Sequence, residues 1–203
     1  MARRTKVEAQ QTYNAIIKAA LLLFSKNGVH NTTLEQIAVS ANMTRGAIYW
    51  HFSNKNEILY AIGEYVTLMI KEKLFYELTI AQVKEPLEQL KIYLEKIIFE
   101  ILNNEEIYQS FAILNCKCEY IESYKAILDK MIFCNNEHIE LFTAVYDNAR
   151  KKKLIREDFS TKELAIDTYS FLTGMIRLIL ISGYTENTNF KSLITTHINL
   201  RYK

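Results

Sequence analysis

The chain has 203 residues but only one proline and five glycines, too few for a fold rich in turns or β-hairpins. Hydrophobic residues make up 49% and charged residues 24%, so disordered and fibrous proteins are excluded and a sizeable core can form. The net charge of +2 is unevenly divided, because residues 1–55 hold seven basic and two acidic residues while residues 56–203 hold 18 basic and 21 acidic ones. This asymmetry indicates that the first segment meets a polyanion.

Helical periodicity runs through the chain and predicts an all-α protein. The first helix is expected to end at Gly28, because glycine readily adopts the left-handed conformation that caps helices. Thr32, followed three residues later by Glu35, predicts a capping box for a second helix that ends near Asn42. Thr44 is the expected N-cap of a third helix.

Further helices are expected along the rest of the chain. The fourth begins near residues 53–57 and continues to about residue 80. Pro86 suits the first turn of the next helix, where its missing N–H would have no partner. Ser160 with Glu163 predicts a second capping box, for a helix that stops at Gly183. The other predicted segments are at about 105–116, 119–152 and 189–200.

Compartment and redox state follow from composition. No run of about 18 uncharged apolar residues occurs, and the charged start differs from a signal peptide, so we expect a cytoplasmic protein with no membrane partner. Three cysteines, an odd number, are expected to be reduced thiols.

The second and third helices, joined by about three residues, form the pattern of a helix-turn-helix, whose second helix enters the major groove of DNA. Ala47, Ile48 and Phe52 are expected to face the core. The candidate DNA-binding residues are Thr33, Thr44, Arg45, Gly46, Tyr49, Trp50, His51 and Lys55.

These candidates have different expected roles. Arg45 can present two N–H groups to O6 and N7 of guanine. Tyr49, His51 and Lys55 suit phosphate, and Thr33 adds a hydroxyl and a backbone N–H at a helix N-terminus. For Trp50, a surface aromatic that covers the helix and a base or sugar contact both remain open. The basic residues at positions 3, 4 and 6 are either a solvated tail or a further contact to DNA.

The stretch TTLEQIAVSANMTRGAIYWHFSNKNEIL resembles the DNA-binding domain of the TetR family of transcriptional repressors. Family positions are occupied by Thr44, Gly46, Tyr49, His51, Phe52 and Lys55. MARRTKVEAQQTYNAIIKAALLLFSKNGV, TRGAIYWHF and CKCEYIESY are similar to the AcrR branch, the local repressors of multidrug efflux pumps. The resemblance implies a helix-turn-helix domain over 1–54 and a six-helix ligand-binding and dimerisation domain over 55–203.

In the second domain, the resemblance implies a permissive pocket for hydrophobic, often cationic, drugs. A small hydrophobic inducer is the expected ligand, although any single aromatic here is more readily explained as part of the core than of a pocket. Cys116 to Tyr120 read CKCEY where the AcrR-like pattern has HKCEF, so drug preference is not carried over, and a regulator responsive to a metabolite or to thiol oxidation is the alternative. The candidate ligand residues are Phe75, Phe99, Phe111, Asn115, Cys116, Glu119, Tyr124, Phe133, Phe171 and Met175.

Cysteine and histidine admit a second interpretation. Cys134 and His138 are spaced to share one helical face, which is compatible with a metal or redox site, but the pattern favours cysteines that act as small hydrophobic residues. Gly-rich phosphate loops, nucleophile elbows and HExxH are missing from the sequence, so we expect no enzyme, metal or cofactor.

The last two predicted helices carry apolar residues on more than one face, which indicates a partner. By resemblance, they form a four-helix interface in a homodimer. Such a dimer would place two recognition helices on a pseudo-palindromic operator in double-stranded DNA. The rival to this hypothesis is a helical interaction module that does not bind DNA.

Overall fold

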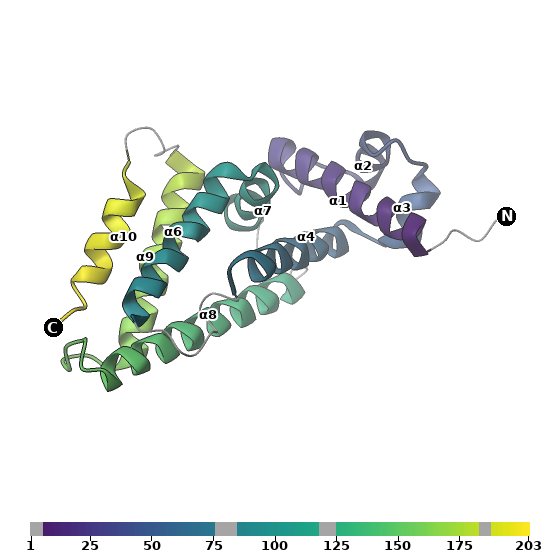
Figure 1. Ribbon diagram of the computed structural model, residues 1–203. Coiled ribbons are helices and arrows are strands. Elements are labelled where there is room, and N and C mark those ends of the chain that lie inside the picture. The colour runs from purple at the N-terminus through teal and green to yellow at the C-terminus, as the bar shows by residue number, and fades with distance from the viewer. Residues whose placement is uncertain (1–5, 76–84, 118–124, 183–187) are drawn as a thin grey trace. The chain divides into compact units, whose positions relative to one another are not determined.

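The computed structural model describes residues 6–75, 85–117, 125–182 and 188–203, and these form nine α-helices and one π-helical turn (Figure 1). The all-α prediction is confirmed, since the β pairing within these ranges is one isolated bridge between Ile155 and Tyr202. The chain divides into two compact units, one from residues 1–66 and 105–130 and the other from 67–104 and 131–203. The predicted division into 1–54 and 55–203 stays a prediction.

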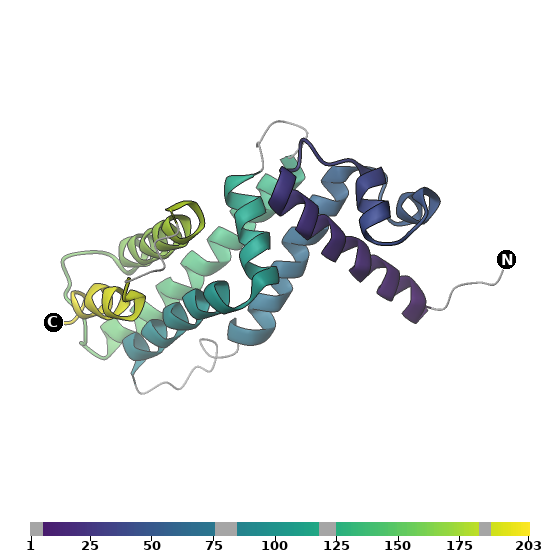
Figure 2. The ribbon, with the colours of Figure 1, turned by 90° about the horizontal axis from the view of Figure 1, so that it is seen from above.

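The first unit is built around three helices, α1 (Lys6–Asn27), α2 (Leu34–Ser40) and α3 (Arg45–His51). Figure 2 shows α2 and α3 beside α1. The unit also contains most of α4 (Lys55–Ile70), all of α7 (Glu105–Cys116), which packs on α1, and the first residues of α8 (Lys125–Lys151). Its core is apolar and includes Ile16, Phe24, Ile37, Ile48, Phe52, Ile58 and Ile113.

The connection from α1 to α2 confirms one prediction and corrects another. Gly28 has φ of +80°, the left-handed conformation that ends α1. The capping box uses Thr33 and Gln36, one residue beyond the predicted pair: Gln36 N donates to Thr33 Oγ1 at 3.1 Å and Thr33 N donates to Gln36 Oε1 at 2.8 Å. Thr32 is buried instead, and its hydroxyl donates to the Gly28 carbonyl at 2.8 Å. Glu35 therefore takes no part in the cap.

The second unit contains the end of α4, the π-helical turn η1 (Lys71–Phe75), α6 (Pro86–Asn103), most of α8, α9 (Thr161–Ser182) and α10 (Phe190–Asn199). Pro86 opens α6 as predicted. The predicted capping box before α9 is confirmed, because Glu163 N donates to Ser160 Oγ at 3.2 Å and Ser160 N donates to Glu163 Oε2 at 2.7 Å. Residues 76–80 of the predicted fourth helix, 119–124 of the next long one and Gly183 lie outside the described residues.

A polar network joins α8, α9 and α10 within this unit. The Tyr146 hydroxyl lies 2.6 Å from Thr168 Oγ1, which lies 3.3 Å from His197 Nε2. The His197 ring stacks on Phe171 at 4.0 Å and faces Arg201, which pairs with Asp167. Burial, reinforced by the positive charge of Arg201, lowers the pKa of His197 to about 4.

Acidification should therefore destabilise the second unit. A histidine with an ordinary pKa near 6.5 when unfolded takes up a proton before His197 does in the folded chain, so stability present above pH 6.5 is lost as the pH falls towards 4. A pKa shift of this size corresponds to at most about 3 kcal/mol, and because His197 is half-buried we expect a loss of roughly 1 to 2 kcal/mol, measured by urea unfolding at a series of pH values. His197→Gln, which cannot titrate, should flatten this part of the profile, and an unchanged profile would remove His197 as the cause.

Among the described residues, one helix, α9, is long and apolar enough to cross a membrane by length and composition alone. Buried helices of soluble proteins meet the same criterion, and one side of α9 packs in the core through Leu172, Met175 and Ile179. Its exposed apolar residues are Ile166, Leu178 and Ile181.

Candidate DNA-reading surface and ligand-binding residues

Three local features fix the recognition helix α3. Thr44 is its N-cap, as predicted, and accepts a hydrogen bond from Ala47 N at 3.2 Å. Ile48 is fully buried, and Phe52, which is 4% exposed, contacts the ring of Tyr13 with centroids 5.1 Å apart. One face of α3 is thus held by the core, and the opposite face is left to solvent.

The exposed face carries most of the predicted DNA-binding residues. Trp50 is 71% exposed and Tyr49 46% exposed. A Cβ added to Gly46 would meet no heavy atom within 4 Å, so packing within the protein does not require glycine there, and its contact with DNA stays a prediction. Thr33, Thr44, Arg45, Gly46, Tyr49 and Trp50 are exposed, whereas His51 and Lys55 are half-buried.

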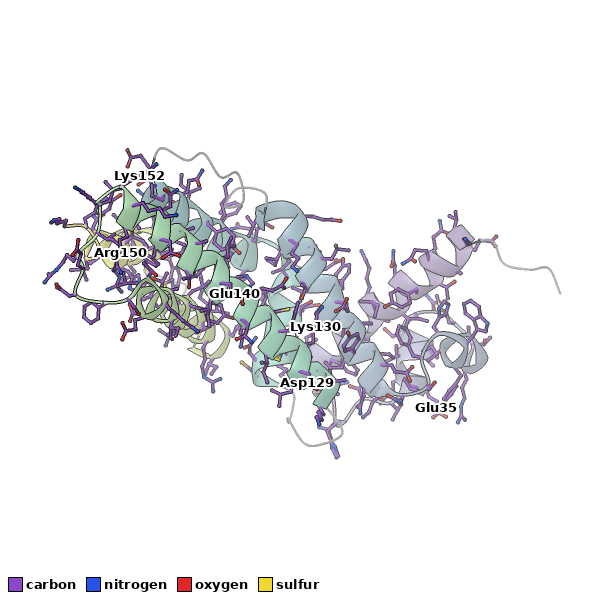
Figure 3. The ribbon with its side chains drawn as sticks, turned by 90° about the horizontal axis from the view of Figure 1, so that it is seen from below. Glu35, Asp129, Lys130, Glu140, Arg150 and Lys152 are labelled. Atoms are coloured by element: carbon purple, nitrogen blue, oxygen red, sulfur yellow. The ribbon has the colours of Figure 1, made fainter. Side chains whose placement is uncertain are left out.

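Arg45 is held by two neighbours at the start of α3. Its Nη1 lies 2.8 Å from Oε1 of Glu35 on α2, and its Cζ lies 5.5 Å from the ring centroid of Tyr49, one turn further along α3. A hydrogen bond with Tyr49 and the negative charge of Glu35 raise the pKa of Arg45. Figure 3 labels Glu35 on the first unit. The sequence contains the glutamate, but its pairing with Arg45 was not predicted.

Lys55 occupies a different environment from the other candidates. Its ammonium donates to the carbonyls of Val29 and His30, each at 2.8 Å, and so joins the start of α4 to the turn after α1. Burial lowers the pKa of Lys55. The predicted contact with phosphate stays a prediction, and the geometry adds a structural role that the sequence did not reveal.

Lys55→Ala is expected to have two effects. Loss of the bonds to the two carbonyls should lower stability by about 1 kcal/mol. If the ammonium also contacts phosphate, binding to all DNA sequences should weaken alike and the salt slope should fall by about 1. Urea unfolding and DNA titrations at several salt concentrations measure both, and a stability loss with an unchanged salt slope would leave Lys55 with the structural role alone.

The predicted ligand residues are divided between the two units. In the first, Phe111 on α7 is half-buried, while Asn115 and Cys116 are exposed. In the second, Met175 is buried, and Phe171 stacks on His197 as described above.

Two of the predicted aromatic candidates are exposed, since Phe99 on α6 is 60% and Phe133 on α8 is 54% exposed. Phe75 ends η1 without a described side chain. Glu119 and Tyr124 lie outside the described residues. Their role in ligand binding, like that of the other candidates, stays a prediction.

The second unit brings together an aromatic cluster on α6, α8 and α9: Tyr93, His138, Phe142 and Tyr169. His138 lies 5.7 Å from Tyr169 and 6.5 Å from Tyr93, measured between ring centroids, and Phe142 lies 5.9 Å from Tyr93. Among the described residues, the buried Tyr93 hydroxyl has no hydrogen-bond partner, and burial raises its pKa.

His138 is a neutral polar group within this cluster. Its Nδ1 lies 2.7 Å from the Cys134 carbonyl, which can only accept, so Nδ1 carries the proton and Nε2 is an acceptor. Burial lowers the pKa of His138. The sequence placed Cys134 and His138 on one face, but the contact is through the backbone, and in the described parts of the chain no three His, Cys, Asp or Glu residues gather to hold a metal.

Charged pairs lie along α8. Lys130 pairs with Glu64 of α4 at 2.6 Å in the first unit. In the second, Glu137 pairs with Lys71 of η1 at 2.9 Å. Figure 3 labels Asp129, Lys130, Glu140 and Arg150 on this helix, and Lys152 directly after it. Glu140 is exposed.

Comparison with known proteins places these features in a family. Residues 16–62 match the family described as bacterial regulatory proteins, tetR family. The chain is 31% identical over 176 residues to the HTH-type transcriptional regulator AcrR of Shigella flexneri, covering 87% of this chain and 81% of that protein.

Solved structures share the whole fold. NalD, the secondary repressor of the MexAB-OprM multidrug efflux pump in Pseudomonas aeruginosa, superposes with a TM-score of 0.83 at 23% identity, covering 98% of this chain and 99% of that one. SmeT, the repressor of the Stenotrophomonas maltophilia multidrug efflux pump SmeDEF, in its triclosan complex gives a TM-score of 0.82 at 24% identity, covering 96% and 93%. With its capped helix-turn-helix, the chain belongs to the TetR family and is a transcriptional repressor of the AcrR type.

Proposed function

We propose that the protein binds a pseudo-palindromic operator as a homodimer and is released from it by a hydrophobic, drug-like compound, so that it controls a multidrug efflux pump. The observation that carries the DNA-binding part is the recognition helix, which is anchored by Ile48 and presents Arg45, Tyr49 and Trp50 to solvent. The excess of basic residues in 1–55 favours a polyanionic partner.

The ligand part of the proposal is supported by the second unit. Its aromatic cluster offers apolar ring edges together with the unpartnered Tyr93 hydroxyl and an acceptor at His138 Nε2. Binding sites of this kind combine a mostly apolar lining with a few polar groups that orient the ligand. Efflux control is inferred from the relatives, because NalD and SmeT are named as repressors of efflux pumps and SmeT is described in complex with triclosan.

The dimer would form through α9 and α10. Exposed apolar side chains on these helices, including the C-cap of α10, are Ile166, Leu178, Ile181, Leu193 and Leu200. Such residues, spread over the outer faces of two helices, are typical of a surface that a partner covers. An equivalent pair from a second copy would bury them and relate the two recognition helices by a two-fold axis.

A DNA titration tests the proposal. An operator is first selected from fragments of the source genome and labelled with fluorescein, and its affinity is measured by fluorescence anisotropy. Triclosan, an uncharged hydrophobic probe, and tetraphenylphosphonium, a cationic one, are then added. We expect at least one to weaken operator binding, because a ligand shifts the equilibrium only if it binds the DNA-incompetent state more tightly. If neither probe changes the affinity, the drug-induction part of the proposal fails.

Thiol oxidation is the second candidate for the inducing signal. Cys116 is exposed and not in a disulfide, so an oxidant can reach its thiol. Hydrogen peroxide in the same titration distinguishes the two signals, and Cys116→Ser is the matched control. If peroxide releases the wild-type protein from the operator but does not release Cys116→Ser, thiol oxidation is favoured as the inducing signal.

A further inference from the structure

We infer that Glu35 is a positioning residue that sets the sequence specificity of DNA binding by holding the guanidinium of Arg45. The inference rests on the proposed role of Arg45 as a reader of bases. Glu35 itself was not among the residues expected to contact DNA. It lies in the first turn of α2, and Arg45 is the first residue of α3, so the pair bridges the two helices of the helix-turn-helix.

The contacts of Arg45 restrict the orientation of its guanidinium but leave some of its N–H donors unused. Nη1 of Arg45 lies 2.8 Å from Oε1 of Glu35, and Cζ of Arg45 lies 5.5 Å from the ring centroid of Tyr49. The guanidinium therefore contacts side chains from both α2 and α3. A guanidinium has five N–H donors in a rigid plane. One bond to the carboxylate and one to Tyr49 therefore still leave donors for the two acceptors on a guanine edge.

The position of Glu35 has a cost for DNA binding. A helix N-terminus attracts phosphate through its free N–H groups, and a carboxylate in the first turn opposes this, although it also stabilises its own helix. Thr33 and Gln36 complete the capping box of α2 without Glu35, so the carboxylate is left to pair with Arg45. Only two acidic residues, Glu8 and Glu35, occur in residues 1–55, and it is Glu35 that faces Arg45.

The pair discriminates between the two kinds of acceptor that DNA offers. A phosphate approaching Arg45 brings a second negative charge next to Glu35 and is repelled. A guanine edge is uncharged and accepts two hydrogen bonds, so it can join the pair without displacing the carboxylate. Glu35 thus weakens the phosphate contact through which Arg45 would bind any sequence, and leaves the base contact intact.

Glu35→Gln tests this directly, since it removes the charge and keeps the shape. Affinities for the selected operator and for a random duplex of equal length are measured by anisotropy at several salt concentrations. We expect binding to random DNA to tighten by about fivefold to tenfold, with a salt slope steeper by about 1, as Arg45 gains a phosphate. Operator affinity should change by less than about twofold, so the specificity ratio falls. The unfolding temperature should match that of the wild type, because both side chains are more than half exposed.

Glu8→Gln is the matched control, since it removes the other acidic residue of 1–55, also from the first turn of a helix. This substitution changes the net charge by the same amount but leaves the Glu35–Arg45 pair intact. If it lowers the specificity ratio as much as Glu35→Gln does, or if Glu35→Gln leaves the ratio unchanged or weakens both DNAs equally, the inference is overturned.

Combination with Arg45→Ala separates this inference from the function on which it rests. With Arg45 removed, adding Glu35→Gln should lower the specificity ratio no further, because the carboxylate acts through the guanidinium. An additive effect would contradict the inference while leaving base reading by Arg45 intact. If Arg45→Ala alone does not lower the ratio, the proposed base contact fails, and the inference fails with it.

Discussion

Ile48→Ala is expected to abolish operator binding at physiological salt although it removes no group that touches DNA. Ile48 is the residue of α3 that is fully buried, and truncation of such a side chain costs about 2 to 4 kcal/mol. Seven residues are too few for a helix to be stable alone, so α3 depends on this contact to keep its exposed face in place. Urea unfolding gives the loss of stability, and anisotropy gives the loss of DNA affinity.

Val39→Ala is the control for this variant. Val39 lies on the neighbouring helix α2, is also β-branched, and is 77% exposed. Its truncation should change stability by less than about 0.5 kcal/mol and leave operator affinity unaltered. An Ile48→Ala protein that unfolds like the wild type and still binds the operator would show that the core contact is not what positions α3.

Arg45→Ala is expected to relax sequence choice at one base pair of each half-site. Loss of a bidentate contact to guanine costs about 1 to 3 kcal/mol on the operator, or roughly tenfold to a hundredfold in affinity. Binding to random DNA should change far less. A set of operators substituted one base pair at a time, titrated with both proteins, identifies the position at which discrimination is lost.

Arg45→Lys separates the charge from the shape of the guanidinium. Lysine keeps the positive charge but cannot donate in the same planar fork, so we expect the salt slope to stay near the wild-type value while discrimination falls. Equal losses on operator and random DNA for both variants would mean that Arg45 contacts phosphate and does not read a base.

Helix boundaries show how much of the fold nearby residues in the sequence can predict. Thr44, Pro86 and the Ser160–Glu163 pair were predicted correctly because caps and first turns depend on residues within one turn. The cap of α2 was predicted one residue early, since Thr32–Glu35 and Thr33–Gln36 both have the required spacing. Thr32 was the wrong choice because it is buried against the end of α1, where its hydroxyl bonds to Gly28.

For the DNA-reading surface, the sequence predicts which residues are exposed but not what they contact. Residues that are exposed at the start of α3 follow from the helical period once Ile48 and Phe52 are assigned to the core. What Lys55 contacts does not follow, since its ammonium bonds to carbonyls 25 and 26 residues earlier in the chain. Nor does the link between Glu35 and Arg45, which needs the crossing of two helices.

In the second unit the sequence indicated which types of residue would be present, but not which of them meet. It contains many aromatics at helical spacing, and any of them suits a core. The meeting of Tyr93, His138 and Tyr169 depends on how three helices pack, and this packing leaves the hydroxyl of Tyr93 without a partner in the described part of the chain.

The sequence by itself determined the helical class, the helix-turn-helix and the basic character of residues 1–55, because periodicity, caps and charge are local properties. Tertiary structure decided which polar side chains are held and by which groups: Arg45 by Glu35, Lys55 by two carbonyls, and His197 by Thr168 and Arg201. Such contacts join side chains from different helices, and their geometry exists only once the helices have packed.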